Sequence, residues 1–93
     1  MTQITKLYTK LSKRPTPSDV SFNELNRLLK YYGFESRQPA RGGSHYVYMH
    51  SLLEGFHLTI PRDKPIKKPY TRAAVEAVNR IIELTSGDDH YDY

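Results

Sequence analysis

The fold of this chain is decided by the stretch Arg41-Gly42-Gly43-Ser44-His45-Tyr46-Val47-Tyr48. The paired glycines end one strand-like segment, because glycine adopts backbone angles that are closed to other residues. Apolar and polar residues alternate after the turn, which predicts a second strand over residues 45–50. The remaining elements can be placed outward from this turn.

His45 is the candidate functional residue of the stretch. A histidine just past such a turn lies at the rim of a sheet, and imidazole titrates near neutral pH, which suits proton transfer. The alternative is an ordinary hairpin turn with His45 as a half-buried strand residue. Strand parity leaves its face open, because His45 shares one face with Val47 and Met49, while Tyr46 and Tyr48 share the other.

Three strands are predicted in the middle of the chain, over residues 34–41, 45–50 and 56–60. Pro39 limits the first strand or marks it as an edge. In the third, Phe56, Leu58 and Ile60 alternate with polar residues. Short links between sequential strands predict a three-stranded antiparallel meander.

The clearest helix signal begins at Ser21, which forms a capping box with Glu24. Gly33 is expected to end this helix in the left-handed conformation, followed by Phe34 as the hydrophobic closure. A closing helix is predicted over residues 70–84. A short amphipathic helix over residues 3–13 must dock on this domain, on a second copy or on another protein, because so brief a helix is marginal alone.

The predicted order is short helix, helix, three strands, helix, which is an α+β fold. Two helices suffice to cover one face of the sheet. This α-β-β-β-α layout is the one used by double-stranded-RNA-binding domains. We expect an N-terminal helical extension over residues 1–17, the main domain over residues 18–86, and a disordered acidic tail over residues 87–93.

Charge points to a polyanionic partner. The net charge is +4, and residues 1–86 hold all 14 lysines and arginines against seven acidic residues. Such an excess favours RNA above other partners. The chain has no cysteine, signal peptide or apolar run of membrane-spanning length, so we expect a cytoplasmic protein with no membrane partner.

Over residues 18–84 the chain resembles the HicA toxins of prokaryotic toxin–antitoxin pairs. The resemblance is carried by the order and spacing of four motifs: Ser21-Phe22-Asn23-Glu24-Leu25 leading to Leu28-Leu29, Gly33-Phe34, Gly43-Ser44-His45, and Leu58-Thr59-Ile60-Pro61. It implies an mRNA interferase on a double-stranded-RNA-binding-like fold, with His45 as the catalytic residue. It also implies a HicB-type antitoxin that blocks the RNA-binding surface.

The chain departs from this family pattern in two places. Family members often carry another histidine soon after the Ile-Pro pair, where this chain has Arg62-Asp63-Lys64. Whether a second group assists His45 therefore stays open. The N-terminal helix resembles an extension found in some relatives.

The expected chemistry is metal-independent endoribonuclease cleavage without a cofactor. The ribose 2′-hydroxyl can act as the nucleophile, so the protein must supply proton transfer and charge stabilisation. His45 is the candidate acid or base, and the sequence leaves these two roles undivided. The expected RNA-binding residues are phosphate-binding cations, donor amides and one tyrosine for base stacking: Arg41, Arg62, Lys64, Lys67, Lys68, Gly43, Ser44 and Tyr48.

A non-catalytic RNA-binding or protein-interaction module of the same fold is the rival hypothesis. A domain that has lost its activity and serves as a scaffold is a third. The four histidines show neither the helical pairing nor the tight spacing of a zinc site, so no metal is predicted. His57 in a single His-x-Thr motif is most simply a surface strand residue.

Overall fold

The computed structural model describes residues 3–38 and 45–89. It is an α+β fold with three helices and one three-stranded antiparallel sheet. The elements in chain order are α1 (Gln3–Leu11), α2 (Phe22–Tyr31), β1 (Glu35–Arg37), β2 (His45–Met49), β3 (Leu58–Pro61) and α3 (Lys68–Asp89). After α1, this order is compatible with the predicted α-β-β-β-α arrangement.

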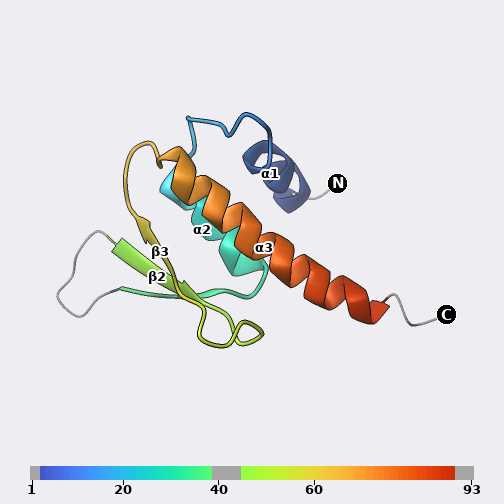
Figure 1. The fold of residues 1–93 in the computed structure, drawn as a ribbon. Coiled ribbons are helices and arrows are strands. Elements are labelled where there is room, and N and C mark those ends of the chain that lie inside the picture. Colours follow the sequence, from blue (N-terminus) through green and yellow to red (C-terminus); the bar gives the residue numbers. More distant parts are fainter. Residues whose placement is uncertain (1–2, 39–44, 90–93) are drawn as a thin grey trace.

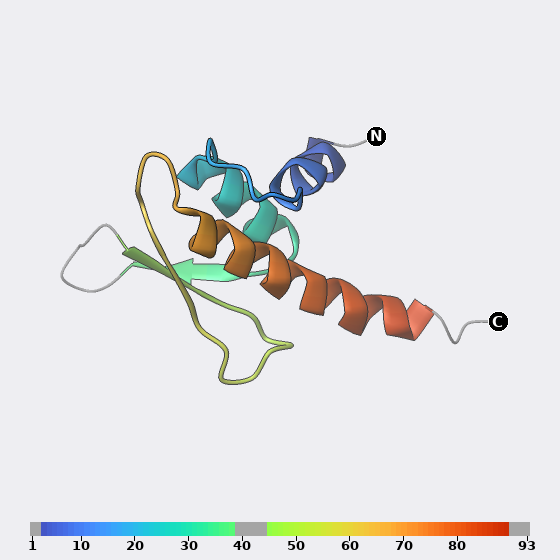
Figure 2. The ribbon, with the colours of Figure 1, turned by 45° about the horizontal axis from the view of Figure 1, so that its top comes forward.

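The elements form three layers (Figures 1 and 2). The sheet has the order β1-β2-β3, as expected of a meander. α2 packs against β1, α3 packs against β3, and the two helices contact each other. α1 lies on α2 and α3, on the side away from the sheet. The helices therefore share one face of the sheet, and no element of the described ranges packs on the other.

The strand register shows which side chains of β2 face the core. Tyr46 pairs with Ile60 and Tyr48 with Leu58. Tyr48 is fully buried and Ile60 is too, so these pairs point into the core. Because side chains alternate along a strand, His45 points to the open face.

The predicted caps of α2 are confirmed. The Ser21 side chain accepts a hydrogen bond from the Glu24 amide, and the Glu24 carboxylate accepts one from the Ser21 amide. Gly33 has φ +92°, the left-handed conformation expected at the helix end. Phe34 then enters the core, and its amide donates to the Leu29 carbonyl. These caps fix where α2 begins and where β1 can start.

The structure shows that α1 docks on this domain. Leu7 and Leu11 belong to the core, and Lys10 Nζ lies 2.8 Å from Glu24 Oε2. Arg27 also donates to the Gln3 side chain over 2.8 Å. Burial raises the pKa of Glu24, but hydrogen bonds from Lys10 and Ser21 outweigh it, and the net pKa is lowered. The carboxylate that caps α2 thus also holds α1.

Several predicted strand bounds differ from the structure: β2 ends at Met49 rather than His50, and β3 ends at Pro61 rather than Ile60. β3 begins at Leu58 rather than Phe56, because the preceding residues form a hydrogen-bonded turn. In that turn the Leu53 amide donates to the His50 carbonyl, and the Phe56 amide donates to the Leu53 carbonyl. Phe56 still packs on the core next to Phe34. β1 is described only over Glu35–Arg37, and residues 39–41 of its predicted span lie outside the described ranges.

The predicted ends of α1 and α3 are also wrong. α1 ends at Leu11, two residues early. α3 starts at Lys68, since proline is tolerated in a first helical turn, and continues to Asp89. Gly87 weakens a helix by about 1 kcal/mol but does not end it. The first part of the predicted disordered tail is therefore helical, and residues 90–93 lie outside the described ranges.

Candidate functional site

His45 is the first residue of β2 and is exposed. The side chains of Tyr46 and Tyr48 pack toward the helices, so the His45 side chain points to the opposite face of the sheet. Its register partner across the sheet is Pro61, the last residue of β3. The imidazole therefore stands at the end of the sheet, on its open face, with access to water.

The basic connection begins where β3 ends, next to His45. Arg62 and Lys64 follow Pro61 directly, and Lys67 and Lys68 lead into α3. All four side chains are exposed. The register thus places the start of this basic connection at the same end of the sheet as His45, while Lys67 and Lys68 lie at the start of α3.

Arg62 is held by an aromatic pair on the helix side of the sheet. Its guanidinium carbon lies 5.4 Å from the centroid of the Phe22 ring. Phe22 in turn packs on Tyr46, with ring centroids 4.9 Å apart. Because it contacts Phe22 of α2, Arg62 lies on the helix side of the sheet, whereas the His45 side chain points to the open face. The two residues therefore flank one sheet end without sharing a face.

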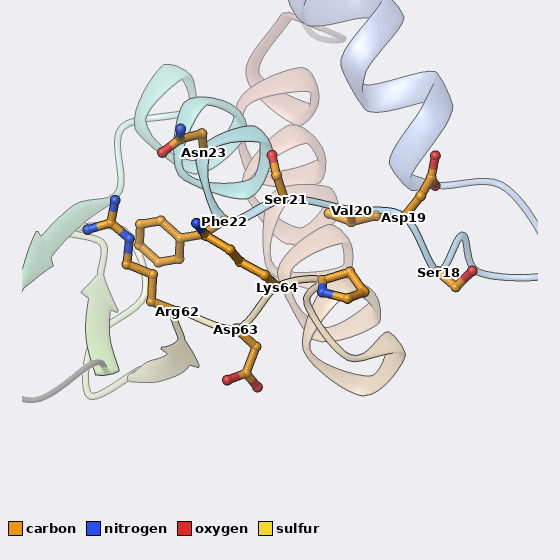
Figure 3. A pocket seen from close by; sticks show the side chains of 10 residues that line it. Ser18, Asp19, Val20, Ser21, Phe22, Asn23, Arg62, Asp63 and Lys64 are labelled. Atoms are coloured by element: carbon orange, nitrogen blue, oxygen red, sulfur yellow. The ribbon is translucent and has the colours of Figure 1, made fainter.

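A cavity lies between the start of α2 and the segment after β3 (Figure 3). Its volume is about 580 Å³. Figure 3 shows the Arg62 and Lys64 side chains running toward Phe22, while the Asp63 carboxylate points away. The lining residues are Ser18, Asp19, Val20, Ser21, Phe22, Asn23, Arg62, Asp63, Lys64 and Pro65.

A second cavity, of about 630 Å³, continues along the basic connection. It shares four lining residues with the first and adds Lys67 and Lys68. Among the described residues, neither Arg62 nor Lys64 forms an ion pair with a carboxylate. The two cavities share part of their lining, and their combined lining holds four cations and two carboxylates, Asp19 and Asp63.

Sequence reasoning missed Phe22 and Asn23 as site residues. Phe22 was assigned to the buried stripe of its helix, and Asn23 had no assigned role. The one available signal was the capping box at Ser21, which fixes the first turn of α2. It could not show that residues 62–65 cover that turn, because the contact depends on the path of the chain after β3.

The prediction that Tyr48 stacks on a base is wrong. Its side chain is 0% exposed, and its hydroxyl donates to Asn26 Oδ1 over 2.7 Å. Burial raises the pKa of Tyr48 to about 12. Tyr48 therefore ties the central strand to α2 and is closed to a ligand. Strand alternation alone did not reveal which face would be covered.

Arg41, Gly43 and Ser44 lie outside the described residues. Their predicted contacts with RNA stay predictions, as does the turn that they were expected to form.

The other described histidines have different surroundings. His50 is structural: its Nε2 lies 2.8 Å from the Tyr32 carbonyl oxygen, and its Nδ1 accepts from the Leu52 amide over 3.0 Å. His57 is exposed. Within residues 3–38 and 45–89, no three His, Asp or Glu side chains gather closely enough to hold a metal ion. The absence of a metal from the reaction stays a prediction.

Comparisons with protein-family models, with curated proteins and with solved structures found no match to this chain. The resemblance noted in the sequence is therefore an expectation. In the described ranges, no helix has both the length and the apolar character needed to cross a membrane.

Proposed function

We propose that this chain is an endoribonuclease toxin of the HicA type that cleaves mRNA in the cytoplasm, with His45 as a general acid or base. The observation that carries the proposal is the position of His45, exposed at the end of the sheet beside a basic connection. A general acid or base must reach the proton that it transfers, and the exposure of this imidazole supports that role.

The reaction needs little from the protein beyond proton transfer and charge stabilisation. The 2′-oxygen of a ribose attacks the adjacent phosphorus and gives up its proton, and the bond from phosphorus to the 5′-oxygen breaks. A proton then goes to the leaving 5′-oxygen. The products are a 2′,3′-cyclic phosphate and a 5′-hydroxyl. His45 takes part in one or both proton transfers.

Lys64 and Arg62 give this end of the sheet positive charge that attracts the phosphate backbone of RNA. Both are exposed, and neither is neutralised by an ion pair among the described residues. Cations without acidic partners attract the phosphate backbone, so affinity for RNA should fall as salt rises.

The fold is a second and less specific observation in favour of the same proposal. An α-β-β-β-α arrangement with helices on one face is the layout of double-stranded-RNA-binding domains, and one face of the sheet is left for a partner. The partner that we propose is a HicB-type antitoxin, which would block the RNA-binding surface. A neighbouring reading frame for a small protein would agree with such a pair.

The test is expression of His45→Ala beside the unchanged chain. The unchanged chain should arrest growth, and His45→Ala should not, because the proton-transfer group is gone. His57→Ala is the matched control, since His57 is also exposed but lies outside the site. Its expression should still arrest growth. Equal arrest by the unchanged chain and by His45→Ala would refute the proposed role of His45.

The ends of the RNA products test the chemistry of the reaction. Attack by the 2′-hydroxyl predicts 2′,3′-cyclic or 3′-phosphate ends, detectable by mass spectrometry of a cleaved oligonucleotide. Products that end in a plain 3′-hydroxyl would contradict this route. A protein that binds RNA and never cleaves it would favour the non-catalytic module instead.

A further inference from the structure

We infer that the cavity between the first turn of α2 and residues 62–65 holds one nucleotide of a single RNA strand, with its base against Arg62 and its phosphate against Lys64. The inference rests on the proposed function and deepens it, since it assigns a base-binding subsite to the same end of the sheet as His45. The sequence predicted phosphate contacts along the basic connection but did not predict this cavity.

The size and lining of the cavity suit a nucleotide. Its volume of about 580 Å³ lies within the range of small-molecule sites. The inner wall is apolar: Phe22 and Pro65 can contact the flat faces and edges of a base, and Val20 lies buried behind them. Asn23 lines the same cavity, and its carboxamide offers both a donor and an acceptor to a base edge.

Arg62 is prepared for stacking. The Phe22 ring holds its guanidinium at 5.4 Å, and Tyr46 supports that ring from β2. A base can stack on a guanidinium plane as it does on an aromatic ring. Because the guanidinium group already contacts Phe22, less conformational freedom is lost when the base binds.

The cations of the cavity favour an anionic group such as a phosphate over a neutral or basic peptide side chain. Lys64 runs toward Phe22 and lies without an ion-pair partner among the described residues. Of the two carboxylates in the lining, Asp63 points away, and Asp19 lies 3.9 Å from Lys10 Nζ. A cation beside an apolar slot matches the alternation of phosphate and base along an RNA strand.

The position of the cavity links it to the proposed cleavage site. Pro61 pairs with His45, and the next residue along the chain is Arg62. A strand whose base occupies the cavity on the helix side can therefore pass over the end of the sheet toward the imidazole. The subsite would position a nucleotide that flanks the cleaved phosphate.

The test measures binding of short single-stranded RNA to the full chain carrying His45→Ala, so that the result does not depend on cleavage. Ser18→Trp adds a large side chain at an exposed position in the lining of the cavity. Ser51→Trp, at an exposed position in the turn before β3, is the matched control. Circular dichroism and thermal unfolding verify that each variant folds.

We expect Ser18→Trp to weaken RNA binding by about tenfold, the scale of one lost base-stacking contact, and Ser51→Trp to leave it unchanged. The same RNA with an abasic site should bind the His45→Ala chain more weakly than intact RNA. Lys64→Ala should lower the slope of log affinity against log salt by about one, whereas Lys30→Ala should not.

Three results would overturn the inference: equal RNA binding by Ser18→Trp and Ser51→Trp, no single abasic position that weakens binding, or displacement of RNA by an acidic peptide whose own binding Ser18→Trp abolishes. The last would assign the cavity to a protein partner. RNA that binds as expected and is never cleaved by the unchanged chain would refute the proposed function and leave the subsite standing.

Discussion

Tyr48 connects the central strand to α2 through a single hydroxyl, which donates to Asn26 Oδ1 across 2.7 Å. Along β2, Tyr46 and Tyr48 alternate with Val47 and Met49, and either pair is apolar enough to face the core. The sequence therefore left two orientations of the strand open. The contacts that select one come from α2: Asn26 receives the Tyr48 hydroxyl, and Phe22 receives the Tyr46 ring. His45 faces water as a consequence of these contacts.

Replacing Tyr48 with Phe should change the response of stability to alkaline pH. Burial raises the pKa of Tyr48 from an ordinary value of 10.0 to about 12 in the folded chain. The group therefore contributes stability that is fully present below pH 10 and is lost as pH rises through 12. A two-unit shift corresponds to about 2–3 kcal/mol.

Urea unfolding at a series of pH values measures this effect. At neutral pH, Tyr48→Phe should cost about 1 kcal/mol for the lost hydrogen bond. Between pH 10 and 12 it should lose less stability than the unchanged chain. Parallel losses in the two proteins over that interval would mean that the Tyr48 hydroxyl is not buried as described.

Gly33 is expected to be intolerant of a side chain for two separate reasons. Its φ of +92° disfavours any L-residue, and an added Cβ would lie 2.9 Å from His50 Nε2. That ring is fixed by the Tyr32 carbonyl and the Leu52 amide. Gly55 has a φ of +77° but nothing within 4 Å of such a Cβ, which makes it the matched control.

Gly55→Ala should cost about 1–2 kcal/mol for its backbone conformation alone. Gly33→Ala should cost at least about 1 kcal/mol more, because His50 must give up a hydrogen bond. Chemical denaturation of both variants measures the difference. Equal costs would show that the His50 ring moves aside freely. The sequence predicted the left-handed Gly33, but nothing local to it revealed the contact with His50.

At the scale of elements, α1 joins the core through Leu7 and Leu11 and packs on α2 and α3. Weakening this packing should therefore lower the free energy of unfolding. Leu11 is 1% exposed, so Leu11→Ala should destabilise the chain by about 2–5 kcal/mol. Lys6→Ala, at an exposed position on the same helix, should change stability by less than about 0.5 kcal/mol.

Thermal or urea unfolding of the two variants tests whether α1 belongs to this domain. A Leu11→Ala protein as stable as the Lys6→Ala protein would contradict the packing. The amphipathic spacing of residues 3–13 predicted the helix and its apolar face. It could not name the partner of that face, because the Lys10 contact with Glu24 and the Arg27 contact with Gln3 join separate elements.

The ends of elements were predictable where a local hydrogen bond or a backbone angle determines them. Ser21 and Gly33 bound α2 as expected. The end of α3 was not, because Gly87 weakens a helix without stopping it, and the chain carries no proline there. The start of β3 was missed because the turn before it is set by backbone hydrogen bonds between the His50, Leu53 and Phe56 peptide groups.

At the scale of the whole molecule, His45, the basic connection and the first turn of α2 lie at one end of the sheet. Figure 3 shows residues 62–64 beside the first turn of α2. The sequence predicted His45 and the cations, since both are visible as local patterns. It did not predict the cavity, because its walls come from residues 18–23 and 62–65, and only the folded chain brings these segments together. α1 lies on the helix side, and among the described residues no element packs on the other face of the sheet.

The most direct test of the central claim is the rate at which the purified chain cleaves a defined RNA, compared with His45→Ala at equal RNA occupancy. Loss of a general acid or base predicts a rate lower by roughly a hundredfold to ten-thousandfold, with affinity for RNA retained. Cleavage by His45→Ala at the rate of the unchanged chain would contradict the account.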